Sequence, residues 1–198
     1  MDKKQDFFDR QAGSWEKYSN NPLLNEKINS LVKTFQLKKG ASVLDMGTGT
    51  GILHQSLRRE VGDEGKIFAL DLSFNMLRLA RKNRAQNNII CLQANASNIP
   101  LQDNICDHII CFACFPHFDA KEKVLQEIYR VCKKKGMLII AHLLNREELF
   151  KHHKGHHVVA RDLLPEPEQM RSLLKGSGFL EIHIQEQPGL YFARGIKL

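Results

Sequence analysis

Three glycines and two acids form the stretch of this sequence that is best suited to hold a ligand. Gly47, Gly49 and Gly51 stand at alternate positions after a short apolar run. Because glycine lacks a Cβ, the backbone here can turn sharply and approach a ligand closely. Asp45 stands two residues before the first glycine, and Asp71 closes the next apolar run. A carboxylate at position 45 disfavours a pyrophosphate but suits a cationic ligand, and an acid placed like Asp71 can bind both hydroxyls of a ribose.

The glycine spacing differs from the dinucleotide-binding fingerprint. That fingerprint is G-x-G-x-x-G and brings a pyrophosphate to a helix N-terminus. Here the spacing is G-x-G-x-G, with Ile52 where the last glycine of the fingerprint would stand. A nicotinamide-dependent oxidoreductase is therefore disfavoured. Two structural interpretations stay open, because Asp45 could bond loop amides and Asp71 could cap the following helix.

Histidines form the second group of residues that could bind a ligand or take part in catalysis. Five of the nine fall in one short segment: His142, His152, His153, His156 and His157. If residues 147–157 are helical, His152 and His156 share a face at i, i+4, as do His153 and His157. Histidines at this spacing can hold a divalent metal ion, which His142 would help to ligate.

Three interpretations of this histidine-rich segment stay open. It is a metal site, a solvated basic lid without a ligand, or the source of a general base for an acceptor hydroxyl or thiol. The candidate bases are His142 and His117. Cys111 and Cys114 have C-x-x-C spacing, but a four-sulfur zinc site needs a second such pair. We therefore interpret these two cysteines as thiols near the end of a strand.

Strands and helices alternate along the chain. Apolar runs and helical spacing predict strands at 42–46, 66–71, 89–93, 108–112 and 137–141, and helices at 52–59, 74–86, 120–132 and 166–175. Gly136 is expected to stop the helix before the fifth strand. Two last strands, 179–186 and 190–197, turn at Pro188-Gly189. The expected fold is α/β, a Rossmann-like, doubly wound sheet of seven strands, mostly parallel with an antiparallel strand from the C-terminal hairpin.

We expect a single domain over residues 1–198. It comprises an N-terminal helical arm (1–40), a ligand-binding core (41–141), a histidine-rich lid (142–165), and a C-terminal helix with a hairpin (166–198). Trp15 and Tyr18 lie three residues apart in the arm, where they either close over the ligand or pack in the core.

The composition is that of an ordinary globular protein, with 42% hydrophobic and 26% charged residues. The net charge is +7, but the basic residues are spread out without interleaved aromatics, so no nucleic-acid partner is expected. No run of 18 apolar residues predicts a membrane span, and the N-terminus lacks a secretory signal. We expect a cytoplasmic monomer or homodimer.

The motifs together resemble those of the class I S-adenosylmethionine (SAM)-dependent methyltransferases over nearly the whole chain. Residues 43–51 resemble the first motif of that family, 70–77 the second, 93–101 the third, and 128–136 the run before its fifth strand. Within the class, the sequence is most similar to the small-molecule branch that includes the quinone-biosynthesis methyltransferases. An Asn-Pro-Pro-Tyr type of signature, typical of enzymes that methylate amino groups of bases or glutamine, is absent after the fourth strand.

This resemblance implies SAM as the cofactor and a small molecule as the methyl acceptor. It implies cofactor contacts for ten residues: Asp45, Gly47, Gly49, Gly51, Asp71, Leu72, Met76, Asn95, Ala96 and Phe112. Asp45 lies near the SAM amino group, Asp71 binds the ribose, and Asn95 reads the adenine edge. The family usually has aspartate where Asn95 stands, although an asparagine carbonyl can still accept a hydrogen bond.

Two functions therefore compete. The first is a methyltransferase whose acceptor atom is oxygen, sulfur, carbon or a metal-associated centre, with the histidine-rich segment at the acceptor site. The second is a non-catalytic module that binds SAM, another nucleoside or a metal ion on the same fold.

Overall fold

The computed structural model describes residues 3–19, 21–82, 88–155 and 157–198. The chain divides into two compact units, Met1–Asn95 and Ala96–Leu198. The first unit contains α1 (Lys3–Ser19), α2 (Pro22–Lys33), β1 (Ser42–Met46), α3 (His54–Val61), β2 (Lys66–Asp71), α4 (Phe74–Lys82) and β3 (Ile89–Gln93). The second contains β4 (Cys106–Phe112), a 3-10 turn (Phe115–His117), α5 (Lys121–Val131), β5 (Cys132–His142), α6 (Arg146–His153), α7 (Pro167–Gly176), β6 (Leu180–Gln187) and β7 (Leu190–Ile196).

The strands of the first unit are parallel neighbours. Leu44 on β1 lies opposite Phe68 on β2, and Phe68 lies opposite Ile90 on β3. Nearly all residues of β1 and β2 are buried, which is typical of parallel strands in α/β proteins. Since parallel strands end at the same edge, the loop after β1 and the residue that closes β2 come together there.

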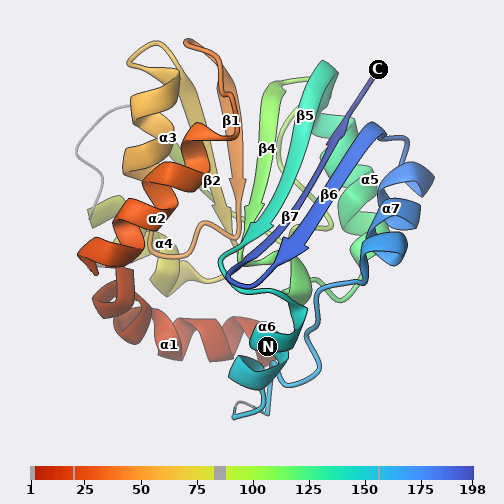
Figure 1. The fold of residues 1–198 in the computed structure, drawn as a ribbon. Coiled ribbons are helices and arrows are strands. Elements are labelled where there is room, and N and C mark those ends of the chain that lie inside the picture. The colour runs from red at the N-terminus through yellow and green to blue at the C-terminus, as the bar shows by residue number, and fades with distance from the viewer. Residues whose placement is uncertain (1–2, 20, 83–87, 156) are drawn as a thin grey trace. The chain divides into compact units, whose positions relative to one another are not determined.

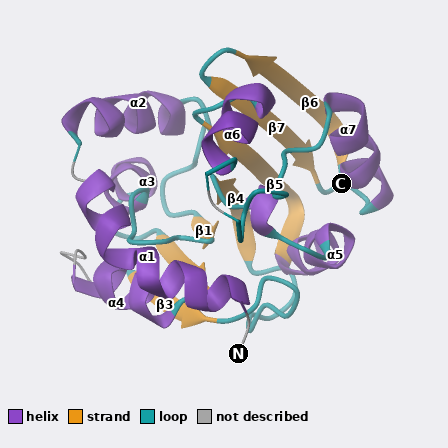
Figure 2. Ribbon diagram, turned by 90° about the horizontal axis from the view of Figure 1, so that it is seen from below, coloured by secondary structure: helices purple, strands orange, loops and turns teal. Residues whose placement is uncertain are grey.

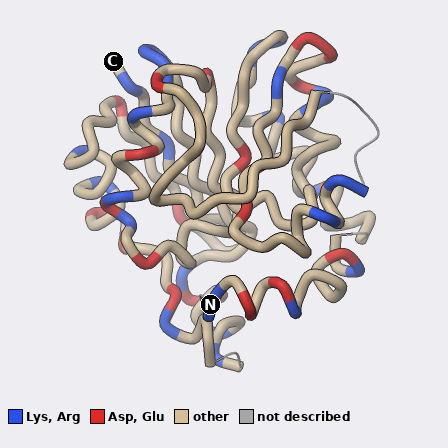
Figure 3. The backbone as a smooth tube through the Cα atoms, turned by 180° about the vertical axis from the view of Figure 1, so that it is seen from behind, with Lys and Arg blue, Asp and Glu red and all other residues tan. Residues whose placement is uncertain are grey.

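Helix α1 lies beyond the carboxyl ends of β1 and β2 (Figure 1). It packs along α4 (Figure 2). Lysines and arginines are interspersed with aspartates and glutamates along α1 (Figure 3), which is typical of a helix with one solvated face. The predicted helical arm is therefore present as α1 and α2.

The second unit combines parallel and antiparallel pairing. β4 and β5 are parallel, with Ile110 opposite Ile139. β7 runs antiparallel to β5 on one side and to β6 on the other. In sheet order, the first unit contributes β3-β2-β1 and the second β4-β5-β7-β6. The seven-stranded order, with parallel pairs in each unit and β7 antiparallel to both of its neighbours, confirms the predicted Rossmann-like fold.

The beginning of β5 differs from the prediction. Gly136 was expected to stop the preceding helix, but α5 ends at Val131 and the strand begins at Cys132. Lys135 has a φ of 63°, and the register between β4 and β5 shifts along this stretch. The lysine-rich segment is therefore a bulged start of the strand, in which one strand locally carries extra residues.

Two further helices differ in their limits from the sequence pattern. The helix considered as one possibility for residues 147–157 is the shorter α6. It begins with a capping box: Glu148 N–H donates to the Asn145 side chain at 2.9 Å, and the Glu148 carboxylate accepts from Asn145 N–H at 2.8 Å. The helix ends at His153. The helix expected over 74–86 is described as far as Lys82, and residues 83–86 lie outside the described part.

Lys197 fastens the end of β7 to the end of α5. Its Nζ donates hydrogen bonds to the carbonyls of Tyr129 at 2.7 Å and Cys132 at 2.9 Å, and to the Asn104 side chain at 2.9 Å. It also lies 4.4 Å from the centroid of the Tyr129 ring, within cation–π range. One lysine thus satisfies helix-end carbonyls that would otherwise lack a donor.

None of the helices that the structure describes combines the length and the apolar character needed to cross a lipid bilayer.

Candidate functional site

The glycine loop after β1 adopts a conformation that requires glycine. Gly47, Gly49 and Gly51 have φ values of 60°, 55° and 84°, in the left-handed region that other residues rarely adopt. A Cβ at Gly51 would lie 2.5 Å from the His54 ring, whereas a Cβ at Gly49 would meet nothing within 4 Å. The loop is therefore packed against protein at Gly51 and open at Gly49, where a ligand can approach the backbone.

Asp71 ties the glycine loop to the turn after β2. One carboxylate oxygen accepts from Gly49 N–H at 2.8 Å, and the other accepts from Ser73 N–H at 2.9 Å. The residue is only 9% exposed. Burial raises the pKa of Asp71 to about 6, although these backbone donors favour the charged form. The cap of α4 is Ser73, whose Oγ accepts Met76 N–H at 3.1 Å, so Asp71 holds the turn before the helix and the glycine loop rather than capping the helix itself.

Asp45 is buried within a network that the sequence did not reveal. Its carboxylate accepts from Thr48 Oγ1 at 2.6 Å, and the same hydroxyl lies 2.8 Å from His54 Nε2. His54 Nε2 is 3.8 Å from the carboxylate. Burial raises the pKa of Asp45 to about 7, with the charge of Asp71 adding to the effect. A buried carboxylate that is charged and lacks a cationic partner costs free energy. A cationic ligand that reached Asp45 would offset this cost.

The residues expected near an adenine cluster around the ends of β2 and β3. Met76 is buried and its N–H donates to Ser73 Oγ at 3.1 Å, while Leu72 is half-buried. Asp71 and Gln93 are register partners, so Asn95 lies two residues beyond the partner of Asp71 and is exposed. The first unit therefore brings the glycine loop, both acids and these side chains to one edge of its strands.

Helix α1 is attached to this edge at two points. Near its start, Asp9 accepts hydrogen bonds from Ser73 Oγ and from Asn75 N–H, the latter at 3.0 Å. At its end, Ser19 Oγ lies 2.9 Å from Thr50 Oγ1 in the glycine loop. The aromatic pair of the arm, Trp15 and Tyr18, forms an edge-to-face contact with ring centroids 6.0 Å apart. Whether these rings close over a ligand stays a prediction.

In the second unit, the predicted residues lie on and beyond β4 and β5. Ala96 is buried, and Phe112, at the carboxyl end of β4, is half-buried opposite Ala141. Cys111 and Cys114 are buried cysteines around the end of β4 that are not bonded in a disulfide, as expected.

His117 pairs with an acid that the sequence analysis did not select. Its Nδ1 lies 2.8 Å from Asp162 Oδ2, and the side chains are 14% and 11% exposed. Asp162 N–H donates to Val159 O at 2.9 Å. The Asp162 carbonyl accepts from His153 Nδ1 at 2.8 Å. Asp162 is thus held through its N–H, its carbonyl and its carboxylate.

His142 and His153 complete a cluster around this pair. The His142 ring accepts Leu144 N–H on Nδ1 at 3.0 Å. Burial, reinforced by His117, His153 and His152, lowers the pKa of His142 to about 3. Burial likewise lowers the pKa of His153. A base works best when its pKa is near the working pH, so His142 is poorly suited to the role of general base.

The predicted metal site is not found in the described part of the chain. There, no three histidine, cysteine, aspartate or glutamate residues are placed to hold a metal ion. Because α6 ends at His153, the exposed His157 does not follow it at i, i+4 on a helix. The Nδ1 of His153 is engaged by a carbonyl, and His152 is exposed. His156, a further predicted ligand, lies outside the described residues.

Sequence reasoning missed Thr48, His54, Asp9 and Asp162. One signal was available for the last of these, because Asp162 is the one acid between Glu148 and Glu166, within a segment rich in histidine. The others pair across 3 to 66 positions without a distinctive motif.

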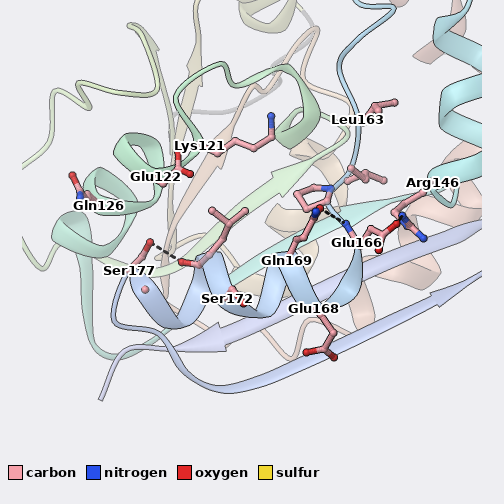
Figure 4. A pocket seen from close by; sticks show the side chains of 14 residues that line it. Lys121, Glu122, Gln126, Arg146, Leu163, Glu166, Glu168, Gln169, Ser172 and Ser177 are labelled. Atoms are coloured by element: carbon pink, nitrogen blue, oxygen red, sulfur yellow. Dashed lines mark hydrogen bonds and ion pairs between the residues drawn. The ribbon is translucent and has the colours of Figure 1, made fainter.

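A groove of about 980 Å³ lies elsewhere on the second unit, between α5, α7 and residues 163–166 (Figure 4). Its rim is charged, with Lys121 from α5, Glu168 from α7, and Arg146 bonded to Glu166 at 3.0 Å. Among the described residues, the predicted site residues do not line this groove.

Comparison with known proteins relates part of the chain to methyltransferases. The family described as "Methyltransferase domain" matches residues 44–140. The chain is 33% identical over 129 residues to the ubiquinone/menaquinone biosynthesis C-methyltransferase UbiE of Vibrio campbellii, covering 61% of this chain and 50% of that protein. The chain spans about half the length of the curated relatives it matches.

Solved structures share the fold along nearly the full chain. A SAM-dependent methyltransferase from Aquifex aeolicus is 26% identical with a TM-score of 0.74, covering 94% of this chain and 98% of that one. The Haloferax volcanii complex of the Trm112 methyltransferase activator with a methyltransferase matches with a TM-score of 0.79 at 20% identity, covering 96% of this chain and 97% of that one. Residues 44–140 thus match the methyltransferase-domain family, and the similarity to the SAM-dependent methyltransferase from Aquifex aeolicus extends over nearly the whole chain.

Proposed function

We propose that the protein is an enzyme that transfers the methyl group of SAM to a small-molecule acceptor. The observation that carries this proposal is the buried carboxylate of Asp71, which accepts the Gly49 N–H of the glycine loop and the Ser73 N–H beyond β2. It makes the loop, the end of β2 and the start of α4 one preorganised structure. The match of residues 44–140 to the methyltransferase-domain family supports SAM as the ligand of this structure.

The residues present fit an adenosyl ligand with cationic groups. The backbone is open at Gly49, and buried carboxylates at Asp45 and Asp71 suit the ammonium and the ribose hydroxyls. Leu72 and Met76 would contact the adenine faces, with Asn95 and the backbone of Ala96 at its polar edge. SAM supplies a methyl carbon that its sulfonium already activates.

The main task of the protein is then to hold donor and acceptor in line and to exclude water, which is catalysis by proximity. The relatives named above act as C-methyltransferases in quinone biosynthesis. For this chain we propose a small organic acceptor that is methylated at carbon, oxygen or sulfur.

Calorimetric titration with SAM and with S-adenosylhomocysteine tests the cofactor site. Asp71→Asn and Asp45→Asn should each weaken SAM binding by roughly 10- to 100-fold, because a charge-assisted bond is lost. Asp63→Asn is the matched control, since Asp63 is an exposed acid of the same unit that pairs with Arg58; its affinity should be unchanged. Undiminished SAM affinity in both site variants would overturn the proposed binding mode.

Transfer of tritium from methyl-labelled SAM to a small-molecule extract tests the reaction itself. Labelled products that vanish in Asp71→Asn support the methyltransferase. If SAM binds but no extract accepts label, the non-catalytic binding module becomes the better description. If SAM does not bind at all, the proposal is wrong.

A further inference from the structure

We propose that Thr48 and His54 are positioning residues for the cofactor, which orient the Asp45 carboxylate toward the ammonium group of an adenosyl amino acid. Neither side chain contacts the ligand, because both act through Asp45. The inference rests on the proposed SAM site and adds to it two residues that the sequence analysis did not select. All three residues lie in the first unit, Met1–Asn95.

The Thr48 hydroxyl lies between Asp45 and His54. It donates to Asp45 Oδ2 at 2.6 Å, and its oxygen is 2.8 Å from His54 Nε2. A hydroxyl has one proton to donate and can accept a hydrogen bond as well. With Asp45 ionised, the proton of Thr48 goes to the carboxylate, so the hydroxyl oxygen accepts from His54 Nε2–H. The three side chains therefore form one directed chain of hydrogen bonds that ends on Asp45 Oδ2.

This chain of hydrogen bonds is buried. Asp45, Thr48 and His54 are only 1%, 3% and 5% exposed, and hydrogen bonds withdrawn from water are electrostatically stronger. Burial raises the pKa of Asp45 to about 7, the Thr48 bond opposes this shift, and the charge of Asp71 adds to it. Thr48 thus favours the charged form, which is the form that binds an ammonium. Since Oδ2 is engaged by Thr48, Oδ1 is the oxygen that we assign to the ligand.

The backbone fixes the spacing of these side chains. Thr48 N–H donates to Leu70 O at 3.0 Å, which ties the glycine loop to β2. Gly51 N–H donates to Thr48 O, and His54 N–H donates to Gly51 O, both at 3.0 Å. Two successive turns thus lead from Thr48 to His54, the first residue of α3. Side chains held in this way need little reordering when a ligand binds.

Gly51 makes room for the imidazole. A Cβ there would lie 2.5 Å from His54 Nδ1 and 2.7 Å from Cε1, whereas a Cβ at Gly49 would meet nothing within 4 Å. The two glycines therefore serve different purposes. Gly49 leaves the backbone open to a ligand, and Gly51 admits the ring that supports Asp45 through Thr48.

A pair of ligands tests whether Thr48 acts through Asp45. S-adenosylhomocysteine has the ammonium group, and 5′-methylthioadenosine is the same thionucleoside without the amino-acid part. In calorimetric titrations, Thr48→Val should weaken S-adenosylhomocysteine binding by roughly 5- to 50-fold, because a charge-assisted bond to Asp45 is lost. The affinity for 5′-methylthioadenosine should stay unchanged, since that ligand has no group for Asp45. Thr48→Ser keeps the hydroxyl and should restore most of the affinity.

Ser56→Ala is the matched control. Ser56 is a buried residue of α3, two positions after His54, and its hydroxyl bonds to the Asn29 side chain. The variant removes a buried hydroxyl from the same helix and leaves the three-residue chain of hydrogen bonds in place. Both ligands should therefore bind it as they bind the unmodified protein.

A double-mutant cycle tests the route of the effect. If Thr48 acts through the Asp45 carboxylate, Thr48→Val should cause no further loss of S-adenosylhomocysteine affinity in an Asp45→Asn background. His54→Leu should weaken binding in the unmodified background, and His54→Gln, which keeps a donor, should weaken it less. In ¹⁵N NMR of the S-adenosylhomocysteine complex, the His54 ring should carry a proton on Nε2.

The pH dependence of binding gives a further readout. The titratable groups near Asp45 are Asp71 at the end of β2 and His54 on α3. Because the Thr48 bond lowers the pKa of Asp45, Thr48→Val should raise that pKa. The loss of S-adenosylhomocysteine affinity on acidification should then begin at a higher pH than in the unmodified protein.

Several results would overturn the proposed role of Thr48 and His54. An equal loss for both ligands in Thr48→Val indicates general damage to the loop. Additive losses in the double variant, an unchanged pH profile, or a His54 ring without a proton on Nε2 in the complex would each contradict action through Asp45. An unmodified protein that binds neither SAM nor S-adenosylhomocysteine would instead contradict the proposed function, so the two failures are distinguishable.

Discussion

Asp45 and Asp71 are carboxylates that the protein keeps buried at some free-energy cost. Their pKa values of about 7 and about 6 arise mainly from burial, which penalises the charged form. Thr48 donates to Asp45, and the backbone of Gly49 donates to Asp71. These donors offset only part of the desolvation cost of the two carboxylates. A bound cationic ligand would offset more of it.

This burial predicts how SAM affinity depends on pH. A cationic ligand binds the ionised carboxylates, and the ionised fraction falls as pH drops through about 7 for Asp45 and about 6 for Asp71. We expect the SAM dissociation constant to rise by roughly 25- to 100-fold between pH 8 and pH 5.5, as measured by calorimetry. Asp45→Asn should flatten the upper part of this curve. A constant affinity over the range would contradict the assigned role of both acids.

The acids of the glycine loop could be predicted from sequence because they stand next to glycines at the ends of apolar runs. The pairing of Asp162 with His117 could not be, since the two residues are 45 positions apart and only tertiary structure brings them together. His142 shows the opposite failure. Its place directly after a strand suggested a base, but burial among other histidines lowers its pKa to about 3.

At the scale of elements, the packing of α7 against α5 depends on one glycine. Gly178 has a φ of 94°, and a Cβ there would lie 2.8 Å from the Tyr129 ring. Gly178→Ala should lower the free energy of unfolding by about 1–3 kcal/mol, because the backbone is strained and the ring must move. The midpoint of thermal unfolding reports this loss.

Gly176→Ala is the matched control for this prediction. A Cβ at Gly176, the last residue of α7, meets nothing within 4 Å, so its stability should be unchanged or slightly higher. Equal stability of the two variants would contradict this prediction, because it would show that the Tyr129 ring tolerates a Cβ at position 178.

Helix α1 should loosen when its attachment to α4 is removed. Asp9 accepts from Asn75 N–H and Ser73 Oγ, so it caps the start of α4 from another helix. Asp9→Ala should destabilise the protein by about 1 kcal/mol and speed amide hydrogen exchange in α1. Asp6→Ala removes the same charge from the first turn of α1. Equal exchange in the two variants would contradict a specific role for Asp9.

Element limits were predictable where local pattern and tertiary pairing agree. β1, β2 and β3 have the predicted limits, because short apolar runs bounded by glycine or polar residues leave little choice. β5 begins earlier than expected, since pairing with β4 and β7 extends it through a lysine-rich run that locally favours a turn. Tertiary pairing commonly overrides local strand preference in this way.

At the scale of the whole molecule, ligand binding should raise the unfolding temperature selectively. At 100 times its dissociation constant, a ligand stabilises a native protein by about 2.7 kcal/mol. S-adenosylhomocysteine should therefore raise the midpoint by roughly 5–10 °C in a protein of this size. NAD at the same concentration should not, because the loop spacing and Asp45 disfavour a pyrophosphate. A larger shift with NAD would contradict the assignment of the cofactor.

The fold class was predictable from sequence because alternating strands and helices allow few arrangements. The histidine chemistry was not, because five clustered histidines fit a metal site, a base or a solvated surface equally well. Two structural facts distinguish the three interpretations. One is the end of α6 at His153, and the other is that His153 contacts the carbonyl of Asp162 and His117 contacts its carboxylate. Both follow from the course of residues 154–155 and 157–165, for which the sequence has no periodic signal.

The bonds from Lys197 to the carbonyls of Tyr129 and Cys132 have a practical consequence for protein production. An affinity tag joined directly after Leu198 would place extra residues next to Lys197 and should disturb its hydrogen bonds. A tag at the other end of the chain, or a flexible glycine–serine spacer before the tag, should leave these hydrogen bonds intact. A chain shortened by two residues at this end loses Lys197 and with it these hydrogen bonds.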